Sequence, residues 1–516
     1  MVDRVFERLL AATRWHPLLV AVLAGAIALP MLGWSGLSRS EGHRAIPGWA
    51  MLERGDFLRV ELFEATYVRK PPGMPWAVAA ASAVFGQNEF AARLPSALGF
   101  IGMSVLVWWF ARRWFGARWG LAAGAAQALM PAMWPWARAA EIEGLHAGMT
   151  QAAALLMIDL CRPRSVVARR SAFTGLWPGL GLGLALSAMV ALKGPSGLPV
   201  VAAAAVGAML AWRSWRVVLS PALGLGVSVA LAIVLPGAWL FARANADEAA
   251  VTQGVSGFLW DATRLSGVAL LAPMALAAAL PASLALLLVW GPDAARERRE
   301  ERTGNGTGGR DERVGTIAWA LALSFLVCVG VYVLAGVSNH RYLLPAAGLL
   351  PPLAAYAARG AALGGPFGSA RRGLARAMCL GHPAVLLAVM IVAAAVAVPL
   401  QERSRARNSA REAGAELGTV LPAGALVLAD GAVDARPEVG DALRRACRGT
   451  VRWDQRLVGA GGLPAPGVFL LLRGDAGSGE LARYRGAIER GELREVARAR
   501  AHTFEFVLLR AEDGGR

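Results

Sequence analysis

The sequence predicts an all-α polytopic membrane protein with a small soluble α/β domain at its C-terminus. Of the 516 residues, 56% are hydrophobic and only 17% are charged, whereas a soluble domain carries about 25% charged residues. Uncharged apolar runs of about 20 residues, the length that crosses a bilayer, recur along most of the chain. The composition therefore places the chain in the membrane class before any motif is considered.

About eleven apolar runs are long enough to be spans, and two more fit within the long eighth and ninth runs, which gives about 11–13 transmembrane helices. We interpret the first run as an uncleaved anchor and not as a secretory signal. The runs are 17–36, 94–111, 119–137, 144–161, 174–192, 195–212, 217–242, 265–290, 315–338, 342–358 and 381–400.

Arginine is concentrated in alternate connecting segments, for example at 112–118 and 296–313. Segments rich in Lys and Arg stay on the cytoplasmic side of a membrane. This pattern predicts a multi-pass protein of the cytoplasmic (inner) membrane, with the N-terminus inside and the C-terminal domain outside. It also accounts for much of the net charge of +17, and we find no nucleic-acid-binding module.

Two domains are predicted: a membrane domain at 1–400, whose first outer loop is 37–93, and an extracytoplasmic α/β domain at 401–516. The tail is predicted to contain three buried strands and two helices, and residues 293–313 are predicted to be a flexible linker. The strands are expected at Ala425–Ala429, Val468–Leu472 and Phe504–Leu509, and the helices at Arg436–Cys447 and Gly479–Ala501.

Lysine is almost absent: of 53 basic residues, only Lys70 and Lys193 are lysines. Lysine provides a compact point charge where arginine provides a planar fork, so a site that holds one phosphate oxygen would resist the exchange. The alternative is that both lysines survived by chance and extend from span ends to the interface. Both belong to short motifs, Lys-Pro-Pro and Lys-Gly-Pro, which the topology places outside.

The first outer loop contains two stretches typical of helices that lie on a membrane surface. In the first, Trp49, Met51, Leu52 and Phe57 are apolar, and charged residues occupy the other side. The second is expected from Trp76 to Phe85. Amphipathic segments with Trp and Tyr suit the membrane interface.

The ordered motifs of this loop resemble those of the polyprenyl-phosphate-dependent glycosyltransferases, which include lipid A aminoarabinose transferase and, more distantly, protein O-mannosyltransferases. The resemblance covers residues 15–400 and implies a GT-C fold. It rests on Glu41, Met51, Leu52, Gly55, Asp56, Tyr67, Lys70, Pro71, Pro72, Trp76, Phe85, Gly86, Ala91, Arg93, Leu94 and Pro95, and then on Lys193-Gly194-Pro195, Pro236–Trp239 and Arg341–Pro345.

The chain departs from the family pattern at the residue before Glu41. The family has Asp-Glu where this sequence has Ser40-Glu41, and Arg44 replaces a family tyrosine. The resemblance implies a catalytic carboxylate at the Asp position, and Glu41 is the nearest replacement. Arg69 stands where the family has Glu before the lysine, which leaves metal dependence open, with a divalent metal ion as one option.

A second group of carboxylates, Glu141 and Glu143, lies at the outer end of the fourth predicted span. The family has an Asp near this point, and Glu143 fits its spacing best. The alternative is that both glutamates only face water at the interface. We interpret His146, one turn further on, as a hydrogen-bonded core residue.

The resemblance implies transfer of a sugar from a polyprenyl-phosphate donor to a lipid, glycan or protein acceptor, with inversion at the anomeric carbon. The expected catalytic residues are Glu41 and Glu143, with Glu141 as a further candidate. The donor phosphate would be bound by Lys70, Tyr67, Arg44, Lys193 and Arg341, with Tyr342 as a further candidate.

Two other functions compete with the enzyme: a transporter of lipid-linked substrates and a non-catalytic relative. A transporter should show charges or helix breaks near mid-membrane in paired halves, which the nearly charge-free runs do not show. The missing Asp at Ser40 keeps the non-catalytic relative in consideration.

Overall fold

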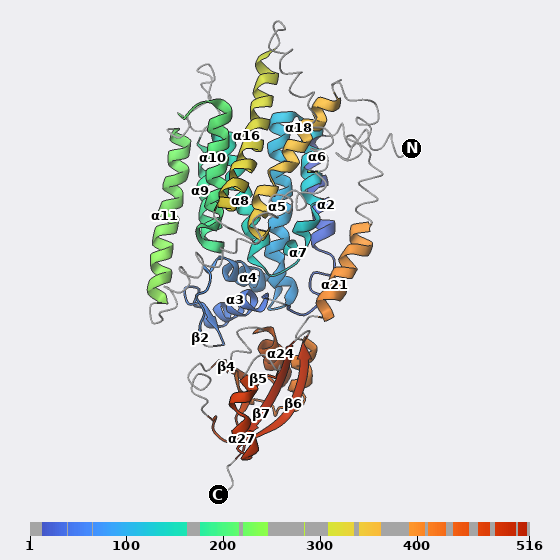
Figure 1. Ribbon diagram of the computed structural model, residues 1–516, viewed down its shortest axis with the longest axis vertical. Coiled ribbons are helices and arrows are strands. Elements are labelled where there is room, and N and C mark those ends of the chain that lie inside the picture. The colour runs from blue at the N-terminus through green and yellow to red at the C-terminus, as the bar shows by residue number, and fades with distance from the viewer. Residues whose placement is uncertain are drawn as a thin grey trace.

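A computed structural model of the whole chain shows a bundle of helices with a smaller mixed domain at one end (Figure 1). The residues that it describes are 13–38, 40–63, 65–161, 176–215, 220–245, 283, 308–334, 340–362, 392–407, 411–429, 437–453, 463–474, 480–501 and 504–512. The predicted eighth span, 265–290, and most of the predicted linker lie outside these ranges.

The bundle is built around helix α5, which packs against most of its other helices along its length. Its helices are α2 (His16–Ala28), α5 (Glu89–Phe115), α6 (Ala117–Ala128), α7 (Trp134–Ala137), α8 (Ile142–Leu160), α9 (Trp177–Lys193), α10 (Leu198–Trp212), α11 (Pro221–Ala244), α16 (Gly308–Leu334), α17 (Leu344–Ala347) and α18 (Leu350–Ala362). Short 3-10 turns occur at Thr13–Trp15, Pro131–Met133, Gly194–Gly197 and His340–Leu343. Most of the predicted spans within the described ranges thus coincide with helices.

Three predicted boundaries were wrong for local reasons. The first span ends early because α2 stops at Ala28, two residues before Pro30. The third is not one helix, since α6 ends at Ala128 and Pro131 starts a separate turn. The predicted linker, 293–313, extends too far, because α16 already begins at Gly308.

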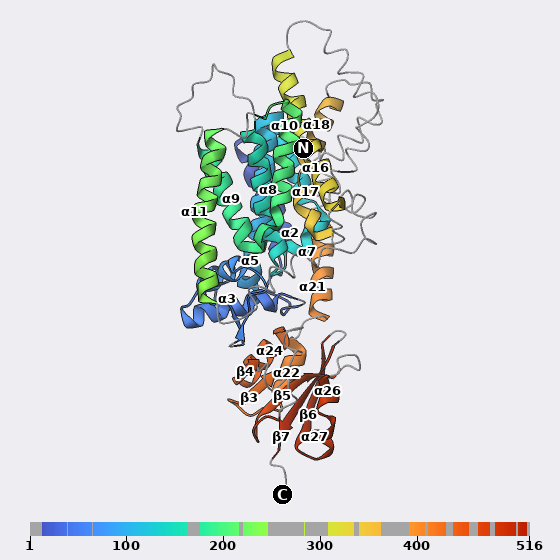
Figure 2. The same ribbon diagram turned by 60° about the vertical axis from the view of Figure 1, so that its left-hand side comes forward.

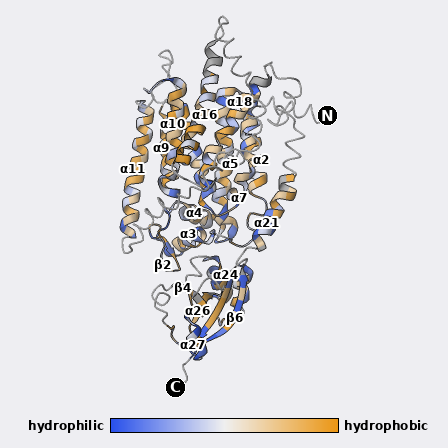
Figure 3. Cartoon of the chain, in the orientation of Figure 1, coloured by the Kyte–Doolittle hydropathy of each residue, from blue (hydrophilic) through white to orange (hydrophobic). Residues whose placement is uncertain are grey.

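By length and composition, four helical segments of the described chain are apolar enough to cross a membrane: Glu89–Phe115, Trp177–Trp212, Pro221–Ala244 and Val314–Leu334. The second contains both α9 and α10, with the turn at Gly194–Gly197 between them. Only 6% of the apolar window of α11 is buried, and this helix stands at the rim of the bundle, hydrophobic along its length (Figure 3). An exposed apolar helix of this kind belongs in lipid.

The first outer loop covers one end of the bundle with helices α3 (Gly42–Arg54) and α4 (Gly73–Phe85) and the short strands β1 (Glu61–Leu62) and β2 (Ala65–Thr66). The two views agree that α3 lies between the bundle and the C-terminal domain (Figures 1 and 2). Its side with Trp49 is covered by protein: Trp49 is 1% exposed, and the Arg445 guanidinium lies 4.5 Å from the centre of its ring. Phe57 falls beyond the helix and is exposed.

The C-terminal region contains a five-stranded sheet in the order β4-β3-β5-β7-β6, with β3 parallel to β4 and β5. Alternate residues of the central strands are buried on both faces of the sheet. The strands are β3 (Leu426–Ala429), β4 (Thr450–Trp453), β5 (Phe469–Arg473), β6 (Leu493–Ala501) and β7 (Phe504–Ala511), and the helices are α21 (Val398–Arg407, after a π turn at Ala393–Ala397), α22 (Arg411–Gly418), α24 (Pro437–Cys447), α26 (Glu480–Arg483) and α27 (Arg485–Glu489).

The three predicted strands and the helix that ends at Cys447 are confirmed, whereas the helix predicted at Gly479–Ala501 is helical only in its first half, at α26 and α27. Its second half is β6, an edge strand paired antiparallel with β7. Arg498 does bond Glu495, three residues away, as it would in a helix. The pair forms here beside a register shift between Glu495 and Ala497, so the charge spacing alone did not distinguish the two structures.

Candidate donor-phosphate site

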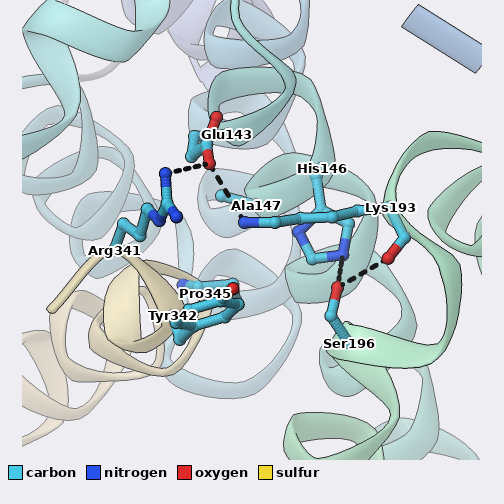
Figure 4. A pocket seen from close by; sticks show the side chains of 8 residues that line it. All are labelled: Glu143, His146, Ala147, Lys193, Ser196, Arg341, Tyr342 and Pro345. Atoms are coloured by element: carbon cyan, nitrogen blue, oxygen red, sulfur yellow. Dashed lines mark hydrogen bonds and ion pairs between the residues drawn. The ribbon is translucent and has the colours of Figure 1, made fainter. Parts of the chain in front are cut away.

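Four segments that are distant in sequence meet where the first outer loop joins the bundle. They are the start of α8, the end of α9, the turn at His340–Leu343 and the first outer loop itself. Each brings at least one ionisable residue predicted from the sequence. Figure 4 shows the part of this site lined by Glu143, His146, Ala147, Lys193, Ser196, Arg341, Tyr342 and Pro345.

Glu143 is the centre of the site and forms ion pairs with two cations. The Lys193 ammonium donates to its Oε1 over 3.1 Å, and the Arg341 guanidinium lies 3.5 Å from the same oxygen. Glu143 and Lys193 are buried, whereas the Arg341 side chain is 35% exposed. The structure thus brings three predicted site residues together.

Tyr342 forms an aromatic wall beside these cations. The Lys193 Nζ lies 4.4 Å from the centre of its ring, and the Arg341 guanidinium lies 5.6 Å away. The ring face attracts positive charge, so Tyr342 holds both cations near one another without neutralising them.

The end of α9 is shaped so that Lys193 points into the site. Gly194 follows with a φ of 65°, a conformation that L residues with side chains rarely adopt. Ser196 Oγ then donates to the Lys193 carbonyl over 3.1 Å. His146 Nε2 lies 3.2 Å from the same hydroxyl, which agrees with the interpretation of His146 as a hydrogen-bonded core residue.

Lys70 reaches the site because its loop packs directly against the end of α9. A Cβ added to Gly73 would lie 2.5 Å from the Ala191 carbonyl oxygen, so only glycine permits this approach. Burial lowers the pKa of Lys70, and the charges of Lys193, Arg44 and Arg341 lower it further. Like charges therefore lie close enough to Lys70 to affect it, with Glu143 acting in the opposite direction.

Tyr67 belongs to the same loop but contacts its own neighbours. Its ring lies 5.4 Å from the His43 ring, and the Arg69 guanidinium is 5.7 Å from its centre. Tyr67 is buried, with 7% of its surface exposed. The structure thus places Tyr67 beside α3, and its predicted contact with the phosphate remains a prediction.

Glu141 lies just before α8 and is bonded to the first outer loop. The Ser40 hydroxyl donates to its Oε1. Burial raises the pKa of Glu141 to about 7, aided by the charge of Glu143 and opposed by Arg44 and by the Ser40 hydrogen bond. Ser40 occupies the position at which the family that this sequence resembles has Asp, and its hydroxyl contacts the carboxylate of Glu141 directly.

Glu41 has a different environment, which does not fit the predicted role of catalytic base. Arg93 Nε and Nη2 donate to its two oxygens, each over 2.8 Å. The backbone N–H groups of Ser38 and Ala140 donate to it as well. The pKa of Glu41 is lowered to about 2: Arg93 outweighs burial, with help from Arg405 and Ala140. A carboxylate so fully bonded is a poor proton acceptor.

Arg138 is also a structural residue, at the same end of the bundle. It donates to the carbonyls of Ile27, Ala28 and Pro30, which end α2, and to Glu402 of α21 over 2.9 Å. Glu402 accepts from Ser35 Oγ over 2.7 Å. These bonds attach α21 to the bundle.

Metal ligation finds little support in the residues present at the site. Among the described residues, no three His, Cys, Asp or Glu side chains come together as metal ligands do. Glu143 is already paired with Lys193 and Arg341, and cations around a carboxylate oppose the binding of another cation. The metal prediction therefore stays open and no step below depends on it.

Sequence reasoning did not identify Ser40, Ser196 and Pro345 as site residues. Ser196 directly follows the Lys-Gly-Pro motif, and Pro345 is the last residue of the motif Arg341–Pro345 but was assigned no role in the site. Ser40 appeared only as a missing carboxylate, and its bond to Glu141 joins residues 101 positions apart, for which the sequence offers no local signal.

The profile of the dolichyl-phosphate-mannose-protein mannosyltransferase family matches residues 69–239. That segment includes Lys70, both glutamates of the site and Lys193. No curated protein sequence matches the chain.

Solved structures extend the likeness to nearly the whole chain. ArnT from Cupriavidus metallidurans bound to undecaprenyl phosphate matches with a TM-score of 0.68 and 19% identity, over 95% of this chain and 97% of that one. Apo ArnT from the same organism matches with the same score and identity, over 96% and 98%. The sequence match and the shared fold confirm the resemblance to the polyprenyl-phosphate-dependent glycosyltransferases of GT-C fold.

Proposed function

We propose that the protein transfers a sugar from a polyprenyl-phosphate donor to a lipid, glycan or protein acceptor at the outer face of the cytoplasmic membrane. The observation that carries this proposal is the gathering of Lys70, Arg44, Lys193 and Arg341 around Glu143, at the end of an apolar bundle. Within the described part of the chain, these four cations gather near two carboxylates, Glu141 and Glu143, so the group suits an anion.

A phosphate ester suits this group better than a carboxylate would. Holding like charges together costs free energy that an anion with several oxygens offsets at once. Lys193 and Arg341 share one carboxylate oxygen, and Lys70 of the first outer loop lies close enough to feel their charges. The lysines provide point charges that fit single phosphate oxygens.

The lipid part of the donor suits the surroundings of the site. The helices next to it expose large apolar side chains, among them Leu184, Leu198 and Leu231. A prenyl chain lying in the bilayer along these helices would bring its phosphate to the end of α9. ArnT was solved with undecaprenyl phosphate bound, which supports a donor of this class here.

The chemistry then requires one displacement. An acceptor hydroxyl or amine attacks the anomeric carbon, the bond from that carbon to the phosphate oxygen breaks, and the electron pair leaves with the polyprenyl phosphate. The cations stabilise the charge that develops on this phosphate. The acceptor proton passes to a nearby carboxylate, Glu141 or Glu143. A single displacement inverts the anomeric centre.

The test uses the full-length protein in detergent or nanodiscs and a polyprenyl-phosphate sugar with a radiolabelled sugar. The sugar and the acceptor are first identified by mass spectrometry, which compares the envelope lipids and glycoproteins of cells with and without the gene. We expect Lys70→Ala to lower transfer by about 100-fold or more, as loss of one transition-state contact does. Arg69→Ala is the matched control, because Arg69 is adjacent and exposed.

Full transfer by Lys70→Ala would refute the phosphate assignment. Unchanged glycans in cells lacking the gene, together with altered movement of lipid-linked sugars across the membrane, would support the transporter instead. Unchanged glycans with unaltered transport would support the non-catalytic relative.

A further inference from the structure

Three buried glutamates lie at the outer end of the bundle, and they differ in their partners. Glu41 is bonded to Arg93, and Glu143 to Lys193 and Arg341. Glu141, 7% exposed, forms no ion pair within the described part of the chain. Its side chain accepts one hydrogen bond there, from Ser40 to Oε1.

We propose that Glu141 is the carboxylate that accepts the acceptor's proton, and that Ser40 positions it. This assignment rests on the proposed glycosyl transfer and decides between the two glutamates left open above. A base needs a lone pair that faces the substrate. Ser40 holds Oε1 of Glu141, which leaves Oε2 to receive the proton.

The contact between Glu141 and residue 40 supports this assignment. The sequence lacks a carboxylate at position 40, but its hydroxyl contacts the Glu141 carboxylate from the start of α8. The carboxylate therefore lies within one hydrogen bond of the place where an acidic residue 40 would extend. It is anchored by its backbone too, since Ser96 Oγ donates to the Glu141 carbonyl over 3.0 Å.

The charges that face Glu141 suit a base that works near neutral pH. Glu143 on α8 and Glu41 before α3 disfavour its ionised form, while Arg44 on α3 and Ser40 favour it. With burial, the balance raises its pKa to about 7. A proton acceptor is most effective when its pKa lies near the working pH. Glu143 is held ionised between its two cations and serves instead to place them.

In the proposed step, the acceptor's O–H or N–H bond breaks as its heteroatom bonds to the anomeric carbon, and the proton moves to Glu141 Oε2. The bond between the anomeric carbon and the phosphate oxygen breaks at the same time. After the product leaves, Glu141 releases the proton to water. No oxidant, reductant or further reactant is needed.

The test compares kcat, donor KM and the pH profile of Glu141→Gln, Ser40→Ala and the exchange variant Ser40→Asp/Glu141→Gln. Glu141→Gln keeps the shape of the side chain, and we expect kcat to fall by about 100-fold or more with donor KM nearly unchanged. The exchange variant should recover part of that loss. Glu53→Gln is the control, because Glu53 is exposed on α3.

Ser40→Ala gives a readout that a purely structural role would not change. Ser40 lowers the pKa of Glu141, so its removal should move the acidic limb of the activity profile to higher pH. An unshifted limb would overturn the positioning role of Ser40.

Glu141→Gln with wild-type kcat would overturn the assignment of the base, and if Lys70→Ala is inactive in the same assay, glycosyl transfer itself stands. If both variants transfer sugar at the wild-type rate, the proposed function fails as well.

Discussion

Two groups of buried charges lie at the same end of the bundle, and they are organised in opposite ways. In the first, which we call the anchor group, Arg93 and Arg138 each face one glutamate and several backbone carbonyls, and both are 0% exposed. In the second, the phosphate group, four cations surround Glu143, and three of them, Arg44, Lys70 and Arg341, are partly exposed.

The difference shows how this protein separates structural from functional charges. In the anchor group each guanidinium donates to several carbonyls and to a carboxylate, and such bonds stabilise a buried charge. In the phosphate group four cations lie close together around Glu143, so a bound phosphate would reduce their mutual repulsion. The carboxylates differ accordingly: the pKa of Glu41 is about 2 and that of Glu141 about 7.

The largest effect is expected from breaking the anchor group. Arg93→Met removes the guanidinium that is bonded to both oxygens of the buried Glu41, a change that costs about 3–5 kcal/mol. We expect loss of folded protein, measured by fluorescence-detected size exclusion and by thermal unfolding in detergent. Arg403→Met, at an exposed position of α21, is the control, and equal stability of the two variants would contradict the structural role of Arg93.

Acid should break the same pair in a defined range. The pKa of Glu41 is lowered from 4.5 to about 2, so its ionised form stabilises the fold above pH 4.5. This contribution is lost as the pH falls from about 4.5 to about 2. The unfolding temperature of the wild type, measured in detergent, should fall at each step to lower pH within this range. A wild-type curve that stays flat would contradict the prediction.

An intermediate effect is expected from the phosphate group. Lys193→Met leaves Glu143 with Arg341 as a counter-charge, so we expect the variant to fold. Its donor affinity and kcat should fall, together about 10- to 100-fold in kcat/KM, because one phosphate contact is lost. Lys193→Arg should recover little, since the fork does not replace a point charge. Transfer assays with the radiolabelled donor measure both, and a variant that fails to fold would place Lys193 in the anchor group.

The smallest effect is expected where the C-terminal domain contacts α3. Arg445 lies over Trp49, and Arg444 lies 3.6 Å from Glu53. Contacts of this type, in which the arginine is partly exposed, contribute about 0.5–1 kcal/mol. Arg445→Ala should therefore lower the unfolding temperature slightly and leave transfer unchanged, as measured on the same preparation. A loss of transfer would show that the domain contact also shapes the phosphate group.

The sequence was most informative where a residue type is itself unusual. Lys70 and Lys193 stood out because arginine fills every other basic position, and the structure brings them together from segments 123 positions apart. The role of Glu41 was harder to predict from the sequence. Its motif suggested catalysis, but its ion-pair partner, Arg93, lies 52 residues away in the chain. Whether a carboxylate is paired cannot be inferred from its neighbours in the chain.

Helices and the buried strands followed from periodicity, which the chain encodes locally. Apolar run length determined the membrane class and most helix positions, and turn residues such as Pro30 determined where helices end. The sequence by itself therefore determined the membrane bundle, the outer loop motifs and the sheet strands β3, β5 and β7.

Only the tertiary structure decided which charges are neutralised, because ion pairing depends on distance in space and on burial. It paired Glu41 with Arg93, placed Glu141 against Ser40, and made β6 an edge strand although its charges are spaced as in a helix. The four cations come from three separate segments, and their mutual repulsion, which makes the site receptive to phosphate, exists only once those segments pack together.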